Sequence, residues 1–283
     1  MPGSTPSQPT ALREGERFIL TRPTIDAAIF EIRFTEPARE VGSEDALRLR
    51  DAGRAAGLDL GEVQPTVAHN VVVSVGPEGA QATSPNPAHG WQLVDSARQL
   101  MVTLLPGTLT VQTSQYERWG ITFRPVLAAL LAEVEAALHP ELRSRIGLRY
   151  VNRIADANAR TAGGWLGKVD AGLLGPILAG PFAGRVQSSQ QQLELVAERG
   201  RGTVLRHGCF QDPAMRRAFT YLIDIDAFDH TTERFTTTDS LEVAQQLNRV
   251  AATTFLNALT PEFASELGMT PVDPLNDEPE VTT

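Results

Sequence analysis

The sequence contains almost no cysteine and almost no lysine. Cys209 is the only cysteine among 283 residues, so the chain has neither an internal disulfide nor a cysteine-based zinc site. Lys168 is the only lysine among 25 basic residues, and the others are arginines. This bias is typical of a GC-rich bacterial genome, and the single thiol predicts a reducing, cytoplasmic compartment.

Long apolar runs and an excess of positive charge are also missing. No apolar run reaches the ~18 residues that a spanning helix requires. The first residues, MPGSTPSQPT, have neither the basic nor the apolar region of a secretory signal. With 25 basic and 34 acidic side chains, the net charge is −9. Phosphate contacts supply most nucleic-acid affinity, so this composition argues against nucleic acids and anionic membranes as partners.

The two ends of the chain differ in composition from the rest. Residues 1–19 are rich in Pro, Ser and Thr, and residues 269–283 combine Pro with acidic residues. Neither segment can bury enough apolar surface to fold, so both are predicted to be disordered tails. The remaining sequence divides into two α+β halves, residues 20–142 and 143–268.

The first half begins with a strand pattern. Apolar and polar residues alternate over 24–34, which predicts a strand with one apolar face. A helix is expected over 43–57, and a two-residue turn at Pro106-Gly107 predicts a hairpin. From 116 to 138 the apolar residues follow helical spacing, which predicts a long helix.

The second half presents the same kinds of elements in the same order. Strands are predicted over 146–154 and 218–229, with a hairpin that turns at 199–202 between them. A long helix is predicted over 240–259, with Ser240 as its N-cap.

The shared order of elements predicts the fold class. We expect an α+β protein whose pseudo-two-fold duplicated antiparallel sheet is backed by two long helices, as in TATA-binding-protein-like or helix-grip folds. The residues of the two halves do not align, so the repeat is one of architecture. By analogy with such folds, the other face of the sheet would be a concave binding surface.

Several motifs resemble those of a sporadically distributed family of bacterial proteins of unknown function. The resemblance covers roughly residues 20–265 and is carried most specifically by the LRYVNR string and by Tyr116 with Trp119. It implies the same domain boundaries and a bacterial origin, and it implies no activity.

The string RIGLRYVNRI places arginines within an apolar segment. On a strand, Arg149 and Arg153 lie on one face, and Tyr150 and Asn152 lie on the other. Such arginines commonly pair with carboxylates, and Glu31 of the first half is a candidate partner. The alternative is that Arg149 and Arg153 bind an anion on the concave face.

Two further groups of residues are candidates for chemistry. Asp224 and Asp226 share one strand face and can hold a divalent cation, although a solvated strand face is the simpler interpretation. Tyr116 and Trp119 lie three residues apart at the start of the first long helix. They either anchor that helix to the sheet or contact a ligand.

The sequence offers no arrangement typical of nucleophilic catalysis. It contains no G-x-S-x-G motif. His207 and Cys209 lie on the same strand face, but at about 6–7 Å along the strand they are too far apart for direct proton transfer. A buried cysteine with an unrelated histidine is therefore expected.

These observations predict a non-enzymatic binding module without a cofactor. It would recognise a protein segment or a small ligand on the sheet face or edge, and its long sheet edges also favour a homodimer. The candidate ligand-binding residues are Arg149, Arg153, Tyr150, Asn152, Tyr116 and Trp119. One alternative is an enzyme that acts on an anionic substrate at Arg149 and Arg153, with a divalent metal at Asp224 and Asp226. A second alternative is nucleic-acid binding through the basic Arg199–Arg217 region.

Overall fold

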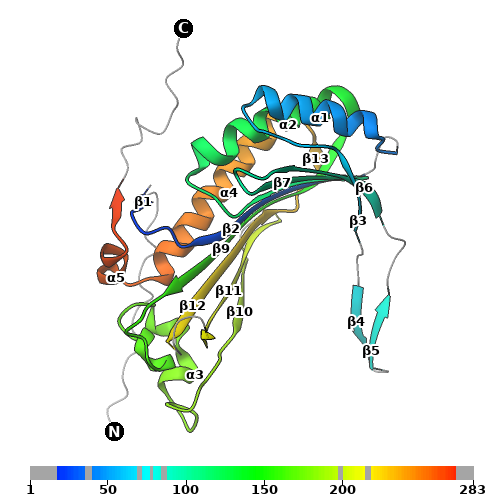
Figure 1. Ribbon diagram of the computed structural model, residues 1–283. Coiled ribbons are helices and arrows are strands. Elements are labelled where there is room, and N and C mark those ends of the chain that lie inside the picture. The colour runs from blue at the N-terminus through cyan, green and yellow to red at the C-terminus, as the bar shows by residue number, and fades with distance from the viewer. Residues whose placement is uncertain are drawn as a thin grey trace.

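The protein is built around one curved antiparallel sheet with helices packed on one of its faces (Figure 1). The computed structural model describes residues 18–35, 40–68, 72–76, 79–83, 88–196, 200–213 and 218–271. A large antiparallel sheet combined with separate helices confirms the predicted α+β class.

Ten strands form the main sheet, and the two strands that open the predicted halves pair at its centre. Because β2 and β9 are hydrogen-bonded neighbours, both halves contribute to one sheet. In spatial order the strands are β10 (Gln191–Val196), β11 (Arg201–Gln211), β12 (Phe219–Asp229), β9 (Leu142–Ala155), β2 (Ile25–Phe34), β8 (Thr108–Thr113), β7 (Leu100–Leu105), β6 (Ala88–Asp95) and β3 (Gln64–Ala68), with β13 (Glu233–Arg234) beside β9.

The predicted hairpin between β7 and β8 is confirmed. Gly107 has φ of 74°, a left-handed conformation that glycine adopts without a steric penalty, and Pro106 precedes it. The β10–β11 hairpin also forms, although part of its predicted turn lies outside the described residues. β4 (Val72–Gly76) and β5 (Gly79–Thr83) form a separate, smaller hairpin.

The helical layer differs from the expected pair of long helices. Three helices lie on the same face of the sheet (Figure 1): α1 (Ser43–Ala55), α2 (Arg124–Leu138) and α4 (Thr237–Ala258). α4 packs on β9 and β12, while α1 packs mainly on α2. Only α4 is long, at 22 residues, because the segment predicted to extend α2 toward its N-terminus forms a separate turn. The shorter helices are η1 (Trp119–Phe123), η2 (Ala162–Trp165), η3 (Ala171–Leu173), α3 (Gly175–Leu178) and α5 (Pro261–Glu266).

The helix ends follow capping chemistry, with one correction to the sequence prediction. Ser240 is not the N-cap of α4, since it lies buried inside the first turn. The cap is Thr236, whose hydroxyl accepts a hydrogen bond from the backbone N–H of Asp239 at 3.1 Å. At the start of α1, the Gly42 N–H donates to Asp45 Oδ2 at 2.9 Å. A carboxylate in the first turn therefore fixes that end of α1 as well.

The two ends of the described chain lie side by side. β1 (Phe18–Leu20) pairs with β14 (Met269–Pro271), so the inner end of each predicted tail forms a strand instead of being disordered. Their apolar side chains pack against the core, as the stacking of Phe18 on Phe255 shows. Residues 1–17 and 272–283, with the disorder predicted for them, lie outside the described residues.

A single apolar core joins both halves. Buried side chains from β2, β9, β12, α2 and α4 belong to one continuous cluster, which includes Phe30, Leu148, Ile225, Leu127 and Phe255. None of the helices in the described part of the chain is long and apolar enough to span a bilayer.

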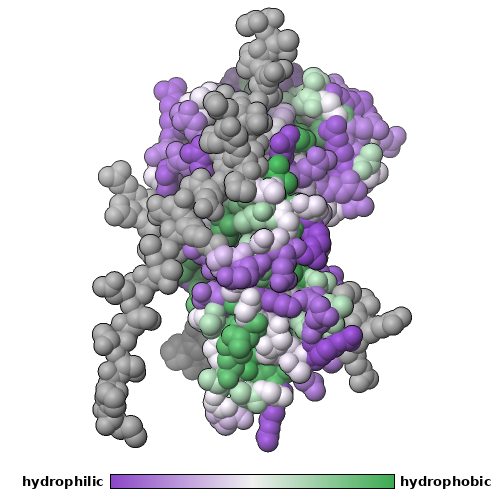
Figure 2. Space-filling view, turned by 90° about the vertical axis from the view of Figure 1, so that its left-hand side faces the viewer, coloured by the Kyte–Doolittle hydropathy of each residue, from purple (hydrophilic) through white to green (hydrophobic). Residues whose placement is uncertain are grey.

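The described surface also exposes some apolar side chains. Leu166 and Phe182, in the segment between β9 and β10, are 58% and 68% exposed. Figure 2 shows apolar surface at the height of α3, below a more hydrophilic upper part. Leu166 and Phe182 are the two most exposed large apolar side chains among the described residues.

Candidate functional site

Strand β9 divides the candidate residues of the LRYVNR string between two faces of the sheet. Tyr150 and Asn152 are buried on the face covered by α4, whereas Arg149 and Arg153 lie on the opposite face and are partly exposed. The predicted alternation is confirmed. The six candidates therefore do not form one site.

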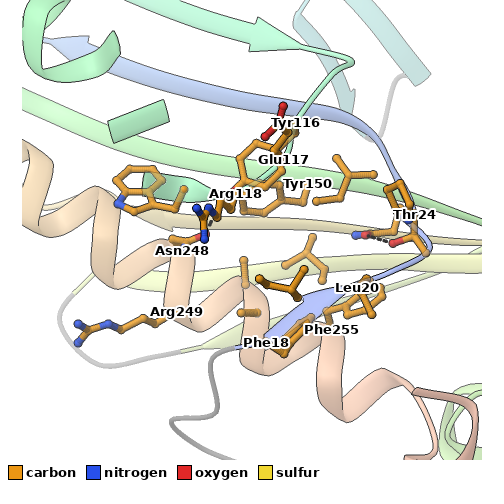
Figure 3. A pocket seen from close by; sticks show the side chains of 18 of the residues that line it. Phe18, Leu20, Thr24, Tyr116, Glu117, Arg118, Tyr150, Asn248, Arg249 and Phe255 are labelled. Atoms are coloured by element: carbon orange, nitrogen blue, oxygen red, sulfur yellow. Dashed lines mark hydrogen bonds between the residues drawn. The ribbon is translucent and has the colours of Figure 1, made fainter. Parts of the chain in front are cut away.

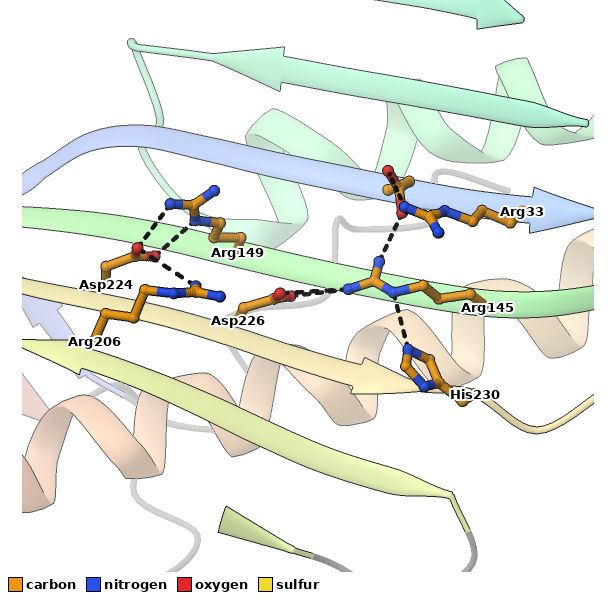
Figure 4. Close-up of polar contacts among 8 residues, drawn as sticks. Arg33, Arg145, Arg149, Arg206, Asp224, Asp226 and His230 are labelled. Carbon is orange, nitrogen blue, oxygen red and sulfur yellow. Dashed lines mark hydrogen bonds and ion pairs between the residues drawn. The ribbon is translucent and has the colours of Figure 1, made fainter. Parts of the chain in front are cut away.

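On the open face, Arg149 forms a bidentate ion pair with Asp224. Arg149 Nε and Nη2 each donate to one carboxylate oxygen of Asp224 at 2.7 Å (Figure 4). Arg206 Nη1 lies 3.6 Å from the same carboxylate. The hydrogen bond to Asp224 is the main reason why the pKa of Arg149 is raised. Two guanidiniums thus neutralise one carboxylate that is only 5% exposed.

Arg145 joins the two halves of the sheet on the same face. Its Nη1 donates to Glu31 Oε1 at 2.8 Å, and its Nη2 donates to Asp226 Oδ1 at 3.2 Å (Figure 4). Its Nε donates to His230 Nε2 at 3.1 Å. Glycine at position 147 makes this arrangement feasible, because a Cβ there would lie 2.0 Å from Arg145 Nη1.

Arg153 is also paired. It forms an ion pair with Asp212, and its Nη1 lies 3.9 Å from Asp26 Oδ2. The expectation that the arginines pair with carboxylates is therefore confirmed. The expected partner Glu31 binds Arg145, Arg149 binds Asp224 of its own half, and Arg153 pairs with Asp212 of its own half and with Asp26 of the first half. Pairing of both arginines disfavours the alternative in which they bind an anionic substrate.

The same contacts disfavour a metal at Asp224 and Asp226. Both carboxylates accept hydrogen bonds from arginines, and a nearby guanidinium repels a cation. Among the described residues, no group of three or more His, Cys, Asp or Glu side chains is arranged to hold a metal ion.

The basic Arg199–Arg217 region is only partly described. Arg199, Arg216 and Arg217 lie outside the described residues. Arg201 Nε donates to Asp229 Oδ2 at 2.9 Å, and Arg206 binds Gln192 and Asp224. The two described arginines are thus engaged with neighbouring side chains, so their charges are partly neutralised.

On the helix-covered face, a cavity of about 500 Å³ lies between the sheet, α4, η1 and β1 (Figure 3). Four of the six candidate residues line it: Tyr116, Trp119, Tyr150 and Asn152. A cavity of this size has room for a molecule as large as a typical drug.

Polar groups inside this cavity form a hydrogen-bonded chain. The hydroxyl oxygens of Tyr116 and Tyr150 lie 3.0 Å apart, and Tyr150 donates to Asn248 Oδ1 at 2.8 Å. Burial, reinforced by Tyr116, raises the pKa of Tyr150 well above its ordinary value. Tyr150 is thus a neutral hydroxyl, and the chain orients hydrogen-bonding groups at an otherwise apolar wall.

A second hydrogen-bonded group fixes another wall of the cavity. Thr24 Oγ1 donates to Asn152 Oδ1 at 2.8 Å, and Asn152 Nδ2 donates to the Ile223 carbonyl at 3.2 Å. Because these bonds connect the residue just before β2 with β9 and β12, the wall keeps its shape without a ligand.

One side of the cavity is formed by η1. This π-helical turn places Trp119 and Gly120 at the lining, and Trp119 is only 7% exposed. π-Helical turns occur frequently at functional sites because they re-aim side chains relative to a regular helix. The sequence pattern predicted a continuous helix here and missed this turn.

Other residues of the cavity lining come from distant parts of the chain and were not predicted from the sequence. β1 contributes Phe18 and Leu20, and α4 contributes Asn248, Arg249 and Phe255. Asn248 offered the only signal, since it is a polar residue next to Leu247 and one turn after Ala244 on the buried side of α4. β1 gave none, because it was assigned to the N-terminal tail.

Cys209 is buried and His207 is not its hydrogen-bond partner, as expected from the sequence. His207 Nδ1 lies 2.9 Å from the hydroxyl of Tyr221, which faces Cys209 across the strands. Burial lowers the pKa of His207 and raises that of Cys209 to about 11. A protonated thiol without a charged partner is a poor nucleophile, which agrees with a structural role.

His207 predicts a specific pH dependence of stability. The unfolded chain binds a proton at His207 near pH ~6.5, whereas the folded protein binds it only at lower pH. Stability should therefore fall as the pH drops below ~6.5, by at most ~1.4 kcal/mol per unit, until folded His207 is protonated. Urea unfolding of wild type and His207→Gln between about pH 5 and 7.5 measures this slope. The slope should shrink in His207→Gln and persist in His89→Gln, because the His89 side chain is exposed. An unchanged slope in His207→Gln would contradict the assignment.

Comparisons with known proteins do not add a family. No protein-family model matches the chain, and no curated protein is significantly similar to it in sequence. The resemblance inferred from the motifs therefore stays a prediction.

Proposed function

We propose that this protein is a small-ligand-binding module and that the ligand occupies the cavity between α4 and the sheet. The observation that carries the proposal is the cavity itself: about 500 Å³, lined by aromatic side chains and by the Tyr116–Tyr150–Asn248 hydrogen-bonded chain. Binding pockets commonly combine an apolar lining with a few oriented polar groups. Among the described lining residues Glu117 is the only carboxylate and there is no cysteine or histidine, so the lining offers few groups for nucleophilic or general-base chemistry.

The ligand would then lie on the helix-covered face of the sheet, and not on the open face that the sequence predicts. Arg149 and Arg153 then hold the strands together through Asp224 and Asp212, and the aromatic candidates contact the ligand. The alternative of an enzyme with an anionic substrate on the open face has less support, since its arginines are paired.

We extend the proposal to the architecture, the cellular location and the oligomeric state of the protein. A pseudo-two-fold arrangement agrees with the strand order, in which β2 is followed outward by β8 and β9 by β12, the last long strand of each half. We likewise propose a TATA-binding-protein-like or helix-grip fold, a cytoplasmic location and a homodimer that forms through the β10 or β3 edge. The exposed apolar residues Leu193 and Leu195 on β10 favour that edge for a dimer.

A neutral fluorescent dye tests whether the cavity takes up an apolar ligand. Nile red should bind wild type with enhanced fluorescence, and Ala252→Trp should weaken this binding at least about tenfold because the indole fills the cavity. Val250→Trp is the matched control on the same helix, since Val250 is exposed and does not line the cavity. Equal binding by Ala252→Trp and Val250→Trp would refute the proposed site.

A further inference from the structure

The charged residues around the cavity have a sign opposite to that of the protein. The described lining contains three arginines, Arg118, Arg124 and Arg249, and one acidic residue, Glu117. The chain as a whole carries a net charge of −9. A locally positive rim on an acidic protein selects anions, because like charges elsewhere repel them and only the rim attracts them.

Two of these arginines are available to a ligand. Arg124 and Arg249 are exposed, and neither forms a hydrogen bond or an ion pair within the described part of the chain. This contrasts with Arg145, Arg149 and Arg153 on the open face, which bind carboxylates. The structure therefore distinguishes arginines that are already neutralised from arginines that are not.

Arg118 and Arg249 lie in a different part of the cavity lining from Phe18, Leu20 and Phe255. Figure 3 shows Arg118 beside Asn248, with Arg249 on the same side, whereas Phe18, Leu20 and Phe255 lie together. The apolar part includes the stacked rings of Phe18 and Phe255, whose centroids are 6.2 Å apart. An elongated ligand would therefore meet two environments.

We propose that the ligand is an amphipathic anion with one acidic head group and an apolar tail. The head lies beside Arg118, Arg124 and Arg249, where guanidinium groups can form charge-assisted hydrogen bonds to it. The tail lies against Phe18, Leu20 and Phe255, where burial of apolar surface favours binding. This assignment rests on the proposed function, since it requires that the cavity bind a small molecule.

Displacement of Nile red by ligands that differ only in head group tests the inference. Decanoate, decanol and decyltrimethylammonium share a ten-carbon tail and carry a negative, neutral and positive head. Wild type should release the dye at decanoate concentrations at least about tenfold lower than for decanol, as expected for one charge-assisted hydrogen bond. Decyltrimethylammonium should be the weakest competitor.

A pair of double variants separates local from global charge. Arg124→Gln/Arg249→Gln should bring decanoate and decanol to within about twofold of each other while Nile red still binds. Arg98→Gln/Arg160→Gln makes the same change in net charge at exposed positions away from the lining, and it should keep the preference. If the three competitors act equally on wild type, or if both double variants keep the preference, the ligand class is wrong. Failure of Nile red to bind would instead refute the proposed function.

Discussion

Asp229→Ala is expected to lower the free energy of unfolding by about 3–5 kcal/mol, the usual cost of removing one partner from a buried charge pair. The side chains of Asp229 and Arg143 are both 0% exposed, and Arg143 Nη1 lies 4.0 Å from Asp229 Oδ1. Asp229 also accepts hydrogen bonds from Arg201 Nε at 2.9 Å and from the Thr231 N–H at 2.7 Å. Without the carboxylate, the buried Arg143 would retain Glu233 as its ion-pair partner, and that side chain is 53% exposed.

Urea unfolding at neutral pH measures this loss. Asp51→Ala is the control, because Asp51 pairs with Arg50 on the exposed side of α1 and its removal should cost less than about 1 kcal/mol. If Asp229→Ala cost no more than Asp51→Ala, Arg143 would have to be hydrated, and the buried arrangement would be incorrect.

The pH dependence of the unfolding free energy tests the role of Asp229 in a second way. Burial alone would raise the pKa of Asp229, but hydrogen bonds from Thr231 and Arg201 and the charge of Arg143 outweigh burial and lower it. A carboxylate whose pKa is lower in the folded state stabilises the fold above its unfolded pKa of ~3.9. That contribution is lost as the pH falls below ~3.9 and through the folded pKa, so the difference between wild type and Asp229→Ala should narrow there.

The faces of the strands were predictable from the sequence because side chains alternate along a strand. That rule alone placed Tyr150 and Asn152 opposite Arg149 and Arg153, as the structure shows. The ion-pair partners were not predictable, because they depend on which strands become neighbours and in what register. β9 pairs with β12 such that Arg149 stands opposite Asp226 along the backbone, yet its guanidinium reaches diagonally to Asp224.

The cavity could not be predicted from local sequence patterns. Its walls come from β1, β2, η1, β9, β12 and α4, so it exists only after both halves and the N-terminal strand have assembled. The sequence drew attention to Tyr116 and Trp119 as an aromatic pair, and both lie at the cavity. It could not show that the segment between Tyr116 and α2 forms a π-helical turn, since the apolar spacing there also suits an α-helix.

The arginines of the open face are occupied by carboxylates. Arginines on a strand can bind a ligand only if carboxylates do not neutralise them first. Here the acidic residues of β2 and β12 lie on the same face, and they engage Arg145 and Arg149 within the sheet. The arginines in RIGLRYVNRI therefore connect strands, and the functional question shifts to the arginines at the cavity rim.

Arg149→Ala should cost about 2–3 kcal/mol, which is less than a fully buried pair would cost. The mutation leaves Asp224, which is 5% exposed, without its bidentate partner. Arg206 still lies 3.6 Å from the carboxylate and partly neutralises it. The stability lost in Arg149→Ala is thus limited by the second arginine.

The stability losses caused by removing Arg149 and Arg206 should therefore not be additive. Arg149→Ala/Arg206→Ala should cost more than the sum of the single variants, by at least about 0.5 kcal/mol, because only the double variant leaves Asp224 with neither arginine. Adding Asp224→Asn to this double variant should recover part of the loss, since no buried charge is left behind. Chemical denaturation of the four proteins of the cycle measures the coupling. Strict additivity, or further destabilisation by Asp224→Asn, would show that Asp224 is solvated and that these arginines contribute packing of their side-chain stems instead of charge.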